Sequence, residues 1–247
     1  NRLQAYAIEG KGADLDGYRQ SAKAVALKLP LAVIGPFDND QGKGFGIEYP
    51  PEKEIDFKAS YPGKIVPVSW RQDMPTNNVG ATLLHDGLYP VEDMLAYAVT
   101  AFETRAAGEY ELRLSSSSAA SVWVDETQVF ASRELERFLF DGVVIPLSLP
   151  AGKHRVLIKS AHENGEWKLL ARLCLPGGAA PDAEAVRLIA PDSPPSAPLK
   201  GVKAVMTEKE LIVWRVKRFA AEPGKKAYLA ARYAAYLGAR QPFVDQT

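Results

Sequence analysis

The sequence predicts a mainly β protein, an antiparallel jelly-roll sandwich with an N-terminal helix and a C-terminal αα-hairpin. Three observations lead to this fold class. Short segments rich in strand formers recur from about residue 65 to residue 175, and several alternate apolar with polar side chains. Turns rich in glycine, proline and polar residues separate these segments, with no helical spacing between them. Helical spacing is found instead near the two ends of the chain.

The first element is a predicted helix over residues 14–29, within an N-terminal helical segment 1–29. Tyr18 and Val25 belong to one apolar stripe, and Pro30 ends the helix. A short apolar run at 31–34 then favours a buried strand, which opens a β-sandwich domain spanning 30–175.

The rest of the sandwich is predicted from strand-forming runs and the turns between them. Val156 and Ile158 should face one side of a strand, and Arg155 and Lys159 the other. By the same alternation, Trp123 should point away from the valines that flank it. The predicted strands cover 64–70, 94–102, 110–114, 122–124, 143–149, 154–159 and 167–175.

The segment 176–206 reads as a linker rich in proline and alanine. Its first 25 residues hold six of the chain's 18 prolines and no aromatic residue, which favours an exposed, extended tether. Residues 187–190 are the exception and could form an added edge strand or a surface clip. From residue 207 to residue 247 the spacing predicts an αα-hairpin, and Thr207 and Glu210 form a capping box at its start.

Composition excludes several classes of protein. Thirty basic and thirty acidic residues give a net charge of zero, so nothing in the total draws the chain to nucleic acid or anionic lipid. The single cysteine, Cys174, excludes an internal disulfide and a cysteine-based zinc site. No apolar run is long enough for membrane insertion.

Two stretches of the sequence resemble known modules. Residues 31–39 with Tyr49–Glu52 and Trp70 resemble the opening of galactose-binding-like jelly-roll modules of large bacterial exported proteins. The run from Tyr97 through 108–114 to Trp167 is similar to these modules and to the PA14-like β-sandwich. The helical hairpin resembles the start of a tetratricopeptide-like region.

The resemblance implies carbohydrate binding and a periplasmic or extracellular location. Calcium-dependent PA14 domains place an Asp-Asp pair before the strand that holds Trp123, where this chain has Ser115–Ser118. Hydroxyl groups are poor substitutes for carboxylates around calcium, which disfavours calcium-dependent sugar capture.

Four aromatic residues are the candidate binding residues: Trp70, Trp123, Trp167 and Tyr89. An aromatic ring can stack on a sugar, although a tryptophan in a strand is more often part of the core.

No cofactor and no metal site are expected. The alternative is a structural calcium ion held by Asp38, Asp40 and Glu52, against the simpler interpretation of residues 38–44 as a solvated loop with an Asx-turn.

The histidines carry no recognisable catalytic motif, and His162 with Glu163 is expected at the surface of a hairpin. We therefore expect a non-catalytic binding or accessory module, a domain of otherwise unknown function, whose partner is a glycan or a neighbouring domain of a larger protein. One alternative is a structural assembly module whose helical tail begins a protein-binding solenoid. The other is a glycan hydrolase, which would need two carboxylates facing each other across a cleft.

Overall fold

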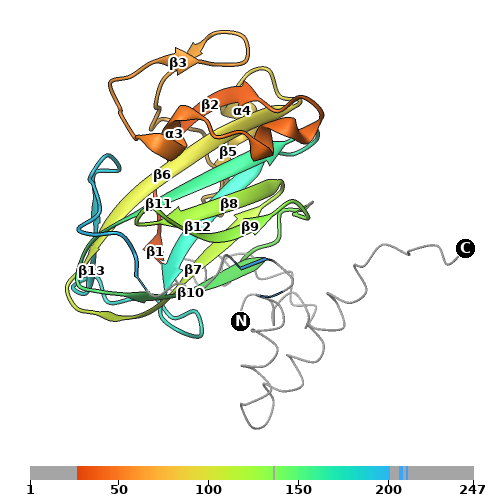
Figure 1. Ribbon diagram of the computed structural model, residues 1–247. Helices are drawn as coiled ribbons and strands as arrows, with labels where there is room; N and C mark the ends of the chain where they lie inside the picture. Colours follow the sequence, from red (N-terminus) through yellow and green to blue (C-terminus); the bar gives the residue numbers. More distant parts are fainter. Residues whose placement is uncertain (1–26, 136, 201–205, 208–209, 211–247) are drawn as a thin grey trace, which may run out of the picture. The chain divides into compact units, whose positions relative to one another are not determined.

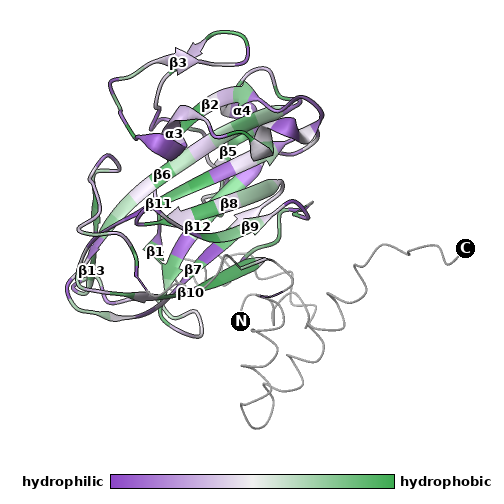
Figure 2. Cartoon of the chain, in the orientation of Figure 1, coloured by the Kyte–Doolittle hydropathy of each residue, from purple (hydrophilic) through white to green (hydrophobic). Residues whose placement is uncertain are grey.

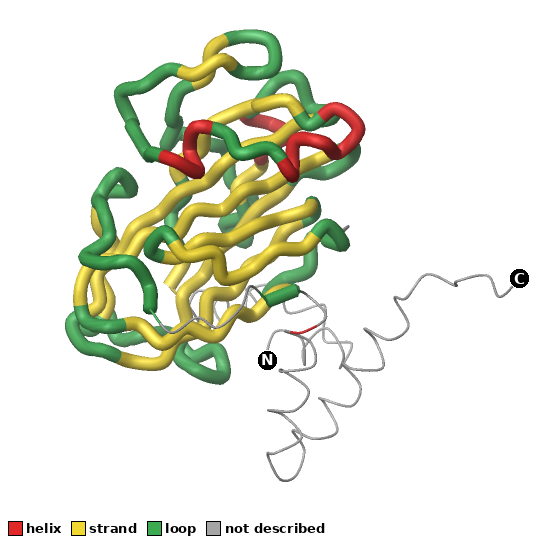
Figure 3. The backbone as a smooth tube through the Cα atoms, in the orientation of Figure 1, coloured by secondary structure: helices red, strands yellow, loops and turns green. Residues whose placement is uncertain are grey.

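The computed structural model describes residues 27–135, 137–200, 206, 207 and 210. The chain divides into two units, Asn1–Val205 and Met206–Thr247. The first unit is mainly β, as the sequence predicts, and its strands are drawn in yellow in Figure 3. Within the described residues no helix is both long enough and apolar enough to cross a membrane.

Thirteen strands and three short helices are described in the first unit (Figure 1). The strands are β1 (Leu27–Lys28), β2 (Ala32–Asp38), β3 (Tyr61–Pro62), β4 (Pro67–Val68), β5 (Thr82–Leu83), β6 (Met94–Thr104), β7 (Gly108–Ser116), β8 (Ala119–Val124), β9 (Thr127–Ser132), β10 (Val143–Leu149), β11 (Gly152–His162), β12 (Lys168–Cys174) and β13 (Val186–Ile189). The helices are η1 (Asp40–Gly46), α3 (Pro50–Lys53) and α4 (Leu84–Gly87).

The strands form two antiparallel sheets and one small hairpin. Sheet A has the order β1-β12-β7-β10, with β5 paired to β12. Sheet B has the order β13-β6-β11-β8-β9, with β2 also paired to β6. The hairpin β3–β4 forms a separate two-stranded sheet, which suits a segment containing Pro67, because proline cannot donate to a central ladder.

The core follows the alternation of side chains along each strand. Val156 and Ile158 of β11 are fully buried, and so are Val122 and Val124 of β8 beside them. Trp123 points to the opposite face of sheet B, as predicted. Figure 2 shows hydrophobic residues along the strands of the sandwich and hydrophilic ones in α3.

The outer face of sheet B is also covered, over part of its length, by residues 39–71. Tyr97 and Leu157 lie in a second hydrophobic cluster, against which Phe45, Tyr49 and Phe57 from this covering segment pack. Burying a second face of the sheet removes further apolar surface from water and stabilises the fold. Strand alternation alone does not predict this layer.

Several predicted boundaries are corrected by strand pairing. Residues 27–28 form a strand beside β12, so the predicted helix does not continue to residue 29. The rest of the predicted N-terminal helical segment 1–29 lies in residues 1–26, which are outside the described residues. The sandwich also extends beyond residues 30–175 at both ends, since β13 joins the edge of sheet B.

The segment predicted as a tether is partly bound to the sandwich. The edge strand that the sequence left open at 187–190 is found as β13. Further on, the Ser196 N–H donates to the Lys153 carbonyl at 2.9 Å, and the Leu199 N–H donates to the Asp125 carbonyl at 3.2 Å. These bonds hold the extended chain against the end of β11, so it is a strap rather than a free linker.

The second unit is described only at three positions, and the predicted αα-hairpin lies otherwise outside the described residues. Its predicted capping box is present: the Thr207 N–H donates to Glu210 Oε2 at 2.8 Å, and the Glu210 N–H donates to Thr207 Oγ1 at 3.3 Å. This bonding lowers the pKa of the Glu210 carboxyl.

Candidate functional site

The structure does not bring the four predicted aromatic residues together. Trp167 is fully buried, its Nε1–H donates to Ser160 Oγ at 2.9 Å, and its ring stacks on His162. Trp70 is 9% exposed and stacks on Phe57 with ring centres 5.1 Å apart. Both tryptophan rings are therefore packed inside the protein rather than presented at its surface.

The other two predicted residues reach the surface. Trp123 is half-buried at the edge of the outer cluster of sheet B, next to Leu157. Tyr89 is 81% exposed, the largest exposure among the exposed large apolar side chains of the described residues. Tyr89 is therefore the predicted residue best placed to meet a ligand.

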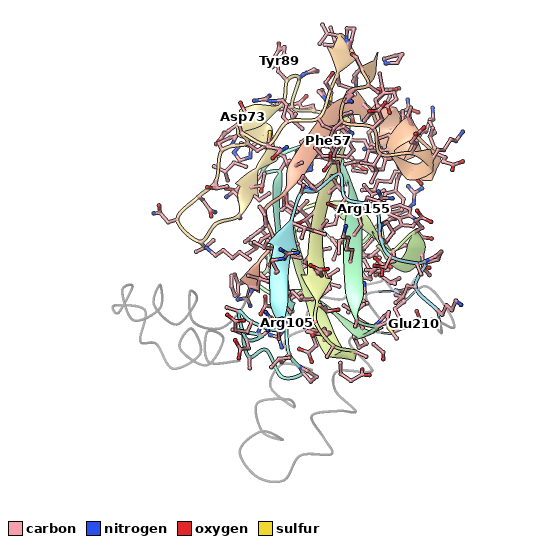
Figure 4. The ribbon with its side chains drawn as sticks, turned by 90° about the vertical axis from the view of Figure 1, so that its left-hand side faces the viewer. Phe57, Asp73, Tyr89, Arg105, Arg155 and Glu210 are labelled. Carbon is pink, nitrogen blue, oxygen red and sulfur yellow. The ribbon has the colours of Figure 1, made fainter. Side chains whose placement is uncertain are left out.

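Two loops carry Tyr89 and its polar neighbours, and we call them the apical loops: residues 71–75 and residues 84–93. They meet directly, because Arg71 Nη1 donates to the Gly87 carbonyl at 2.7 Å. The Met74 side chain also packs so closely on Gly87 that an added Cβ would lie 2.3 Å from its Cε atom. Figure 4 shows Tyr89 and Asp73 near the same end of the molecule.

The apical loops also carry hydrogen-bonding side chains that reach the surface. The Arg71 and Asp73 side chains are 44% and 79% exposed and form an ion pair at 3.2 Å. The hydrogen bond from Arg71 lowers the pKa of the Asp73 carboxyl. The second loop adds the half-exposed Asp86 carboxylate, which contacts His85. Loops that carry both an exposed ring and charged donors and acceptors suit a ligand that has both apolar faces and hydroxyl groups.

Sequence reasoning selected Tyr89 but not Arg71, Asp73 or His85, which lie on the same loops. These residues lie in segments without periodicity, and their juxtaposition depends on contacts between two loops. The available signal was local: polar and turn-forming residues at 71–77 and 85–93 flank short apolar stretches.

The three candidate metal ligands are not grouped as a site. Asp38 pairs with Lys64 at 3.0 Å. Glu52 accepts hydrogen bonds from Lys159 at 2.8 Å and from the Tyr97 hydroxyl. Across the described ranges, no three histidine, cysteine or acidic side chains come close enough together to hold an ion. From η1, Phe45 packs against the outer cluster of sheet B.

Glu52 and its partners form a buried polar group on the outer face of sheet B. Desolvation and the hydrogen bond to Glu52 raise the pKa of Tyr97 strongly. Burial lowers the pKa of Lys159, although Glu52 opposes this effect. Lys159 also donates to the Ile47 carbonyl at 2.6 Å, which joins β11 to the segment covering it.

A Thr–His–Asp arrangement occurs at one end of the core. His154 Nδ1 lies 2.7 Å from Asp125 Oδ2, and its Nε2 lies 3.1 Å from Thr104 Oγ1. However, the Thr104 hydroxyl donates to the Pro150 carbonyl at 2.8 Å, and all three side chains are buried. With its hydroxyl engaged and shielded from a substrate, this group holds the strand ends together.

His162 closes the opposite end of β11, and its predicted surface position is wrong. The residue is 2% exposed, and its Nδ1 lies 2.8 Å from Ser118 Oγ. Burial lowers the pKa of its imidazole, which favours the neutral ring in the folded protein.

The last polar group is a charge cluster, buried on the face of sheet A opposite the core. Arg113 and Arg172 both donate to the Asp141 carboxylate, and Arg113 also donates to Glu111. Burial raises the pKa of the neighbouring Cys174 thiol to about 11, so it stays protonated and weakly nucleophilic at neutral pH.

No protein-family model matches the sequence. No curated protein matches it either. Similar solved structures include the PA14 domain of the MpAFP antifreeze protein, at 11% identity and a TM-score of 0.31, covering 40% of this chain and 55% of that one. A family 35 carbohydrate-binding module from an environmental isolate is 15% identical, with a TM-score of 0.26, covering 38% of this chain and 71% of that one.

Another similar solved structure is that of a larger protein, a beta-glucosidase from Kluyveromyces marxianus, at 10% identity and a TM-score of 0.37. That match covers 81% of this chain and 20% of the glucosidase. The chain spans about half of the PA14 domain structure and a fifth of the glucosidase. A PA14 domain and a carbohydrate-binding module, the classes expected from the sequence, are thus among the similar structures.

Proposed function

We propose that the first unit is a non-catalytic module that binds a glycan through the apical loops, with Tyr89 as the stacking ring. The supporting observation is the 81% exposure of Tyr89 on the apical loops, which also carry the exposed Arg71–Asp73 pair. A ring of this kind can cover the apolar face of a sugar, while the charged groups hydrogen-bond its hydroxyls.

The chemistry of the other candidate groups supports binding rather than hydrolysis. Glycoside hydrolysis needs two carboxylates on either side of the bond that breaks. Glu52, the acid considered for this role, is engaged by Lys159 and Tyr97. The apical acids Asp73 and Asp86 are each paired with a basic side chain, as expected for ligand-orienting groups.

Affinity electrophoresis of the full chain tests the proposal. The gels contain soluble galactomannan, xyloglucan, arabinoxylan, galactan or no polysaccharide. We expect retardation by at least one of them, lost in Tyr89→Ala and reduced in Arg71→Ala. Tyr89→Phe should retain binding because it keeps the ring.

The control variant is Leu188→Ala, which removes an exposed apolar side chain of β13. It should bind as the unmodified protein does. The proposal fails if none of the polysaccharides retards the protein, or if Tyr89→Ala is retarded as strongly as the Leu188→Ala control.

A further inference from the structure

His85 lies at the base of the apical loop that carries Tyr89. Its Nδ1 is 3.1 Å from the Trp167 carbonyl oxygen, and its Nε2 is 3.2 Å from Asp86 Oδ1. The same carbonyl oxygen accepts the N–H groups of Leu84 at 2.9 Å and of His85 at 3.3 Å. This carbonyl oxygen therefore joins the start of helix α4 to the residue before β12.

Both ring nitrogens of His85 face hydrogen-bond acceptors. A backbone carbonyl and an ionised carboxylate only accept, and a neutral imidazole has one N–H to donate. The neutral ring therefore makes one of the two bonds and turns a lone pair toward the other acceptor. The imidazolium form donates to both, so this geometry is completed by the charged ring.

Trp167 provides a rigid partner for this attachment. Its indole is fully buried and held by the hydrogen bond to Ser160. On the other side, the Leu88 N–H donates to the Leu84 carbonyl at 2.9 Å, which connects α4 to the residue before Tyr89. The charge state of the His85 ring thus acts on Tyr89 through the short stretch of chain between residues 85 and 89.

From this geometry we propose that His85 is a positioning residue of the apical site: its protonation fixes α4, so the site that presents Tyr89 is better ordered in mildly acidic solution than in basic solution. The binding consequence rests on the proposed function, because it concerns the same loops. His85 contacts no ligand in this account and acts through α4.

The charged and titratable groups around His85 include two acids and a second histidine. Asp86 on the same helix and Glu166 before β12 are acids that interact with the ring. His162 on β11 is the basic group below it, and burial lowers the pKa of His162, with a smaller contribution from His85. The Asp86 and Glu166 carboxylates thus lie within electrostatic range of the His85 ring.

The first measurement needs no ligand. In the full chain labelled with nitrogen-15, the ring signals of the three histidines and the exchange rate of the Leu88 amide are followed between about pH 5.5 and pH 8. We expect the Leu88 amide, after correction for intrinsic exchange, to lose about tenfold protection as His85 deprotonates. In His85→Gln, which does not titrate, protection should stay constant across this range.

The second measurement repeats the electrophoresis test with whichever polysaccharide retards the protein. It compares the two ends of the same range, about pH 5.5 and about pH 8. Binding should weaken at the higher pH in the unmodified protein and in Leu188→Ala, and should not change with pH in His85→Gln. Asp86→Asn should reduce the pH dependence, because its side chain no longer carries a charge.

The inference is overturned if the unmodified protein and His85→Gln show the same pH dependence of Leu88 exchange. It is also overturned if the His85 ring stays neutral throughout. Lack of binding to every polysaccharide would instead refute the proposed function, and the ring and amide measurements would still decide the role of His85.

Discussion

The buried charge cluster of sheet A predicts a large loss of stability when its central carboxylate is neutralised. Asp141 has no exposed side-chain surface and accepts from Arg113 Nη1 at 2.9 Å and from Arg172 Nε at 3.0 Å. Asp141→Asn keeps the size of the side chain, but it removes the charge and turns an amide N–H₂ toward one guanidinium. Removing one partner of a buried ion pair costs about 3–5 kcal/mol, because the remaining charge stays desolvated.

Urea denaturation of the full chain, followed by tryptophan fluorescence, measures this loss. A unit of this size loses about 2–4 °C in melting temperature per kcal/mol, so thermal unfolding should shift downward by roughly 6–20 °C. The matched control is Asp73→Asn, which neutralises an aspartate in an exposed pair with Arg71 and should change stability little.

Equal unfolding free energies for Asp141→Asn and Asp73→Asn would refute the reasoning. That result would mean that the two arginines find water or another acceptor when the carboxylate is lost. A second comparison guards against a merely unfolded variant. Arg113→Met, Arg172→Met, Asp141→Leu and Glu111→Gln together should recover part of the lost stability, since this set also neutralises the carboxylate that Arg113 pairs with.

Three further predictions concern the core and the cover of sheet B. Val156→Asp should cost several kcal/mol by placing an unpaired charge at a fully buried position, whereas the adjacent Arg155→Ala should cost far less; equal thermal melts would show the strand faces to be misassigned. Because burial lowers the pKa of His162, the unfolded chain binds more protons below the ordinary value of 6.5, so stability should fall as pH drops below 6.5; urea midpoints of His162→Gln that fall as steeply as those of the unmodified protein would contradict this. Gly44→Ala should destabilise by about 1–3 kcal/mol, because its Cβ would lie 2.2 Å from the Asp38 carbonyl oxygen, and an unchanged calorimetric melt would exclude this contact.

The part of the fold that could be predicted from the sequence is the part that follows from the alternation of side chains along strands. Alternation placed Val156 inside and Arg155 outside, and the structure confirms both positions. The same alternation contains a signal that went unused, since His154 and His162 share the even positions of Val156 along β11. Because even-numbered positions share one face of the strand, both side chains are expected to point inward with Val156. Their polar partners, such as Asp125, depend on which strands pair and could not be predicted from the sequence.

The candidate site was less predictable, because loops without periodicity build it. Tyr89 was identified by residue type, but its exposure depends on the path of the chain between α4 and β6. Arg71 lies 16 positions before Gly87 in sequence, and only the folded loops bring their atoms within 2.7 Å. Trp167 shows the reverse case, since residue type made it a candidate binding residue, whereas the fold buries its ring completely.

Strand β6 shares one of its edges between two short strands from distant parts of the chain. β2 pairs with positions from Met94 to Val99, and β13 pairs with positions from Ala101 to Thr104. A fragment that stopped at residue 175 would keep every other strand of both sheets, yet four consecutive positions of β6 would lack a neighbour on the edge opposite β11. Bare strand edges recruit the edges of other molecules, so such a fragment would be prone to aggregate. Solubility of the isolated sandwich therefore depends on a strand that follows its last long strand, inside the proline-rich strap.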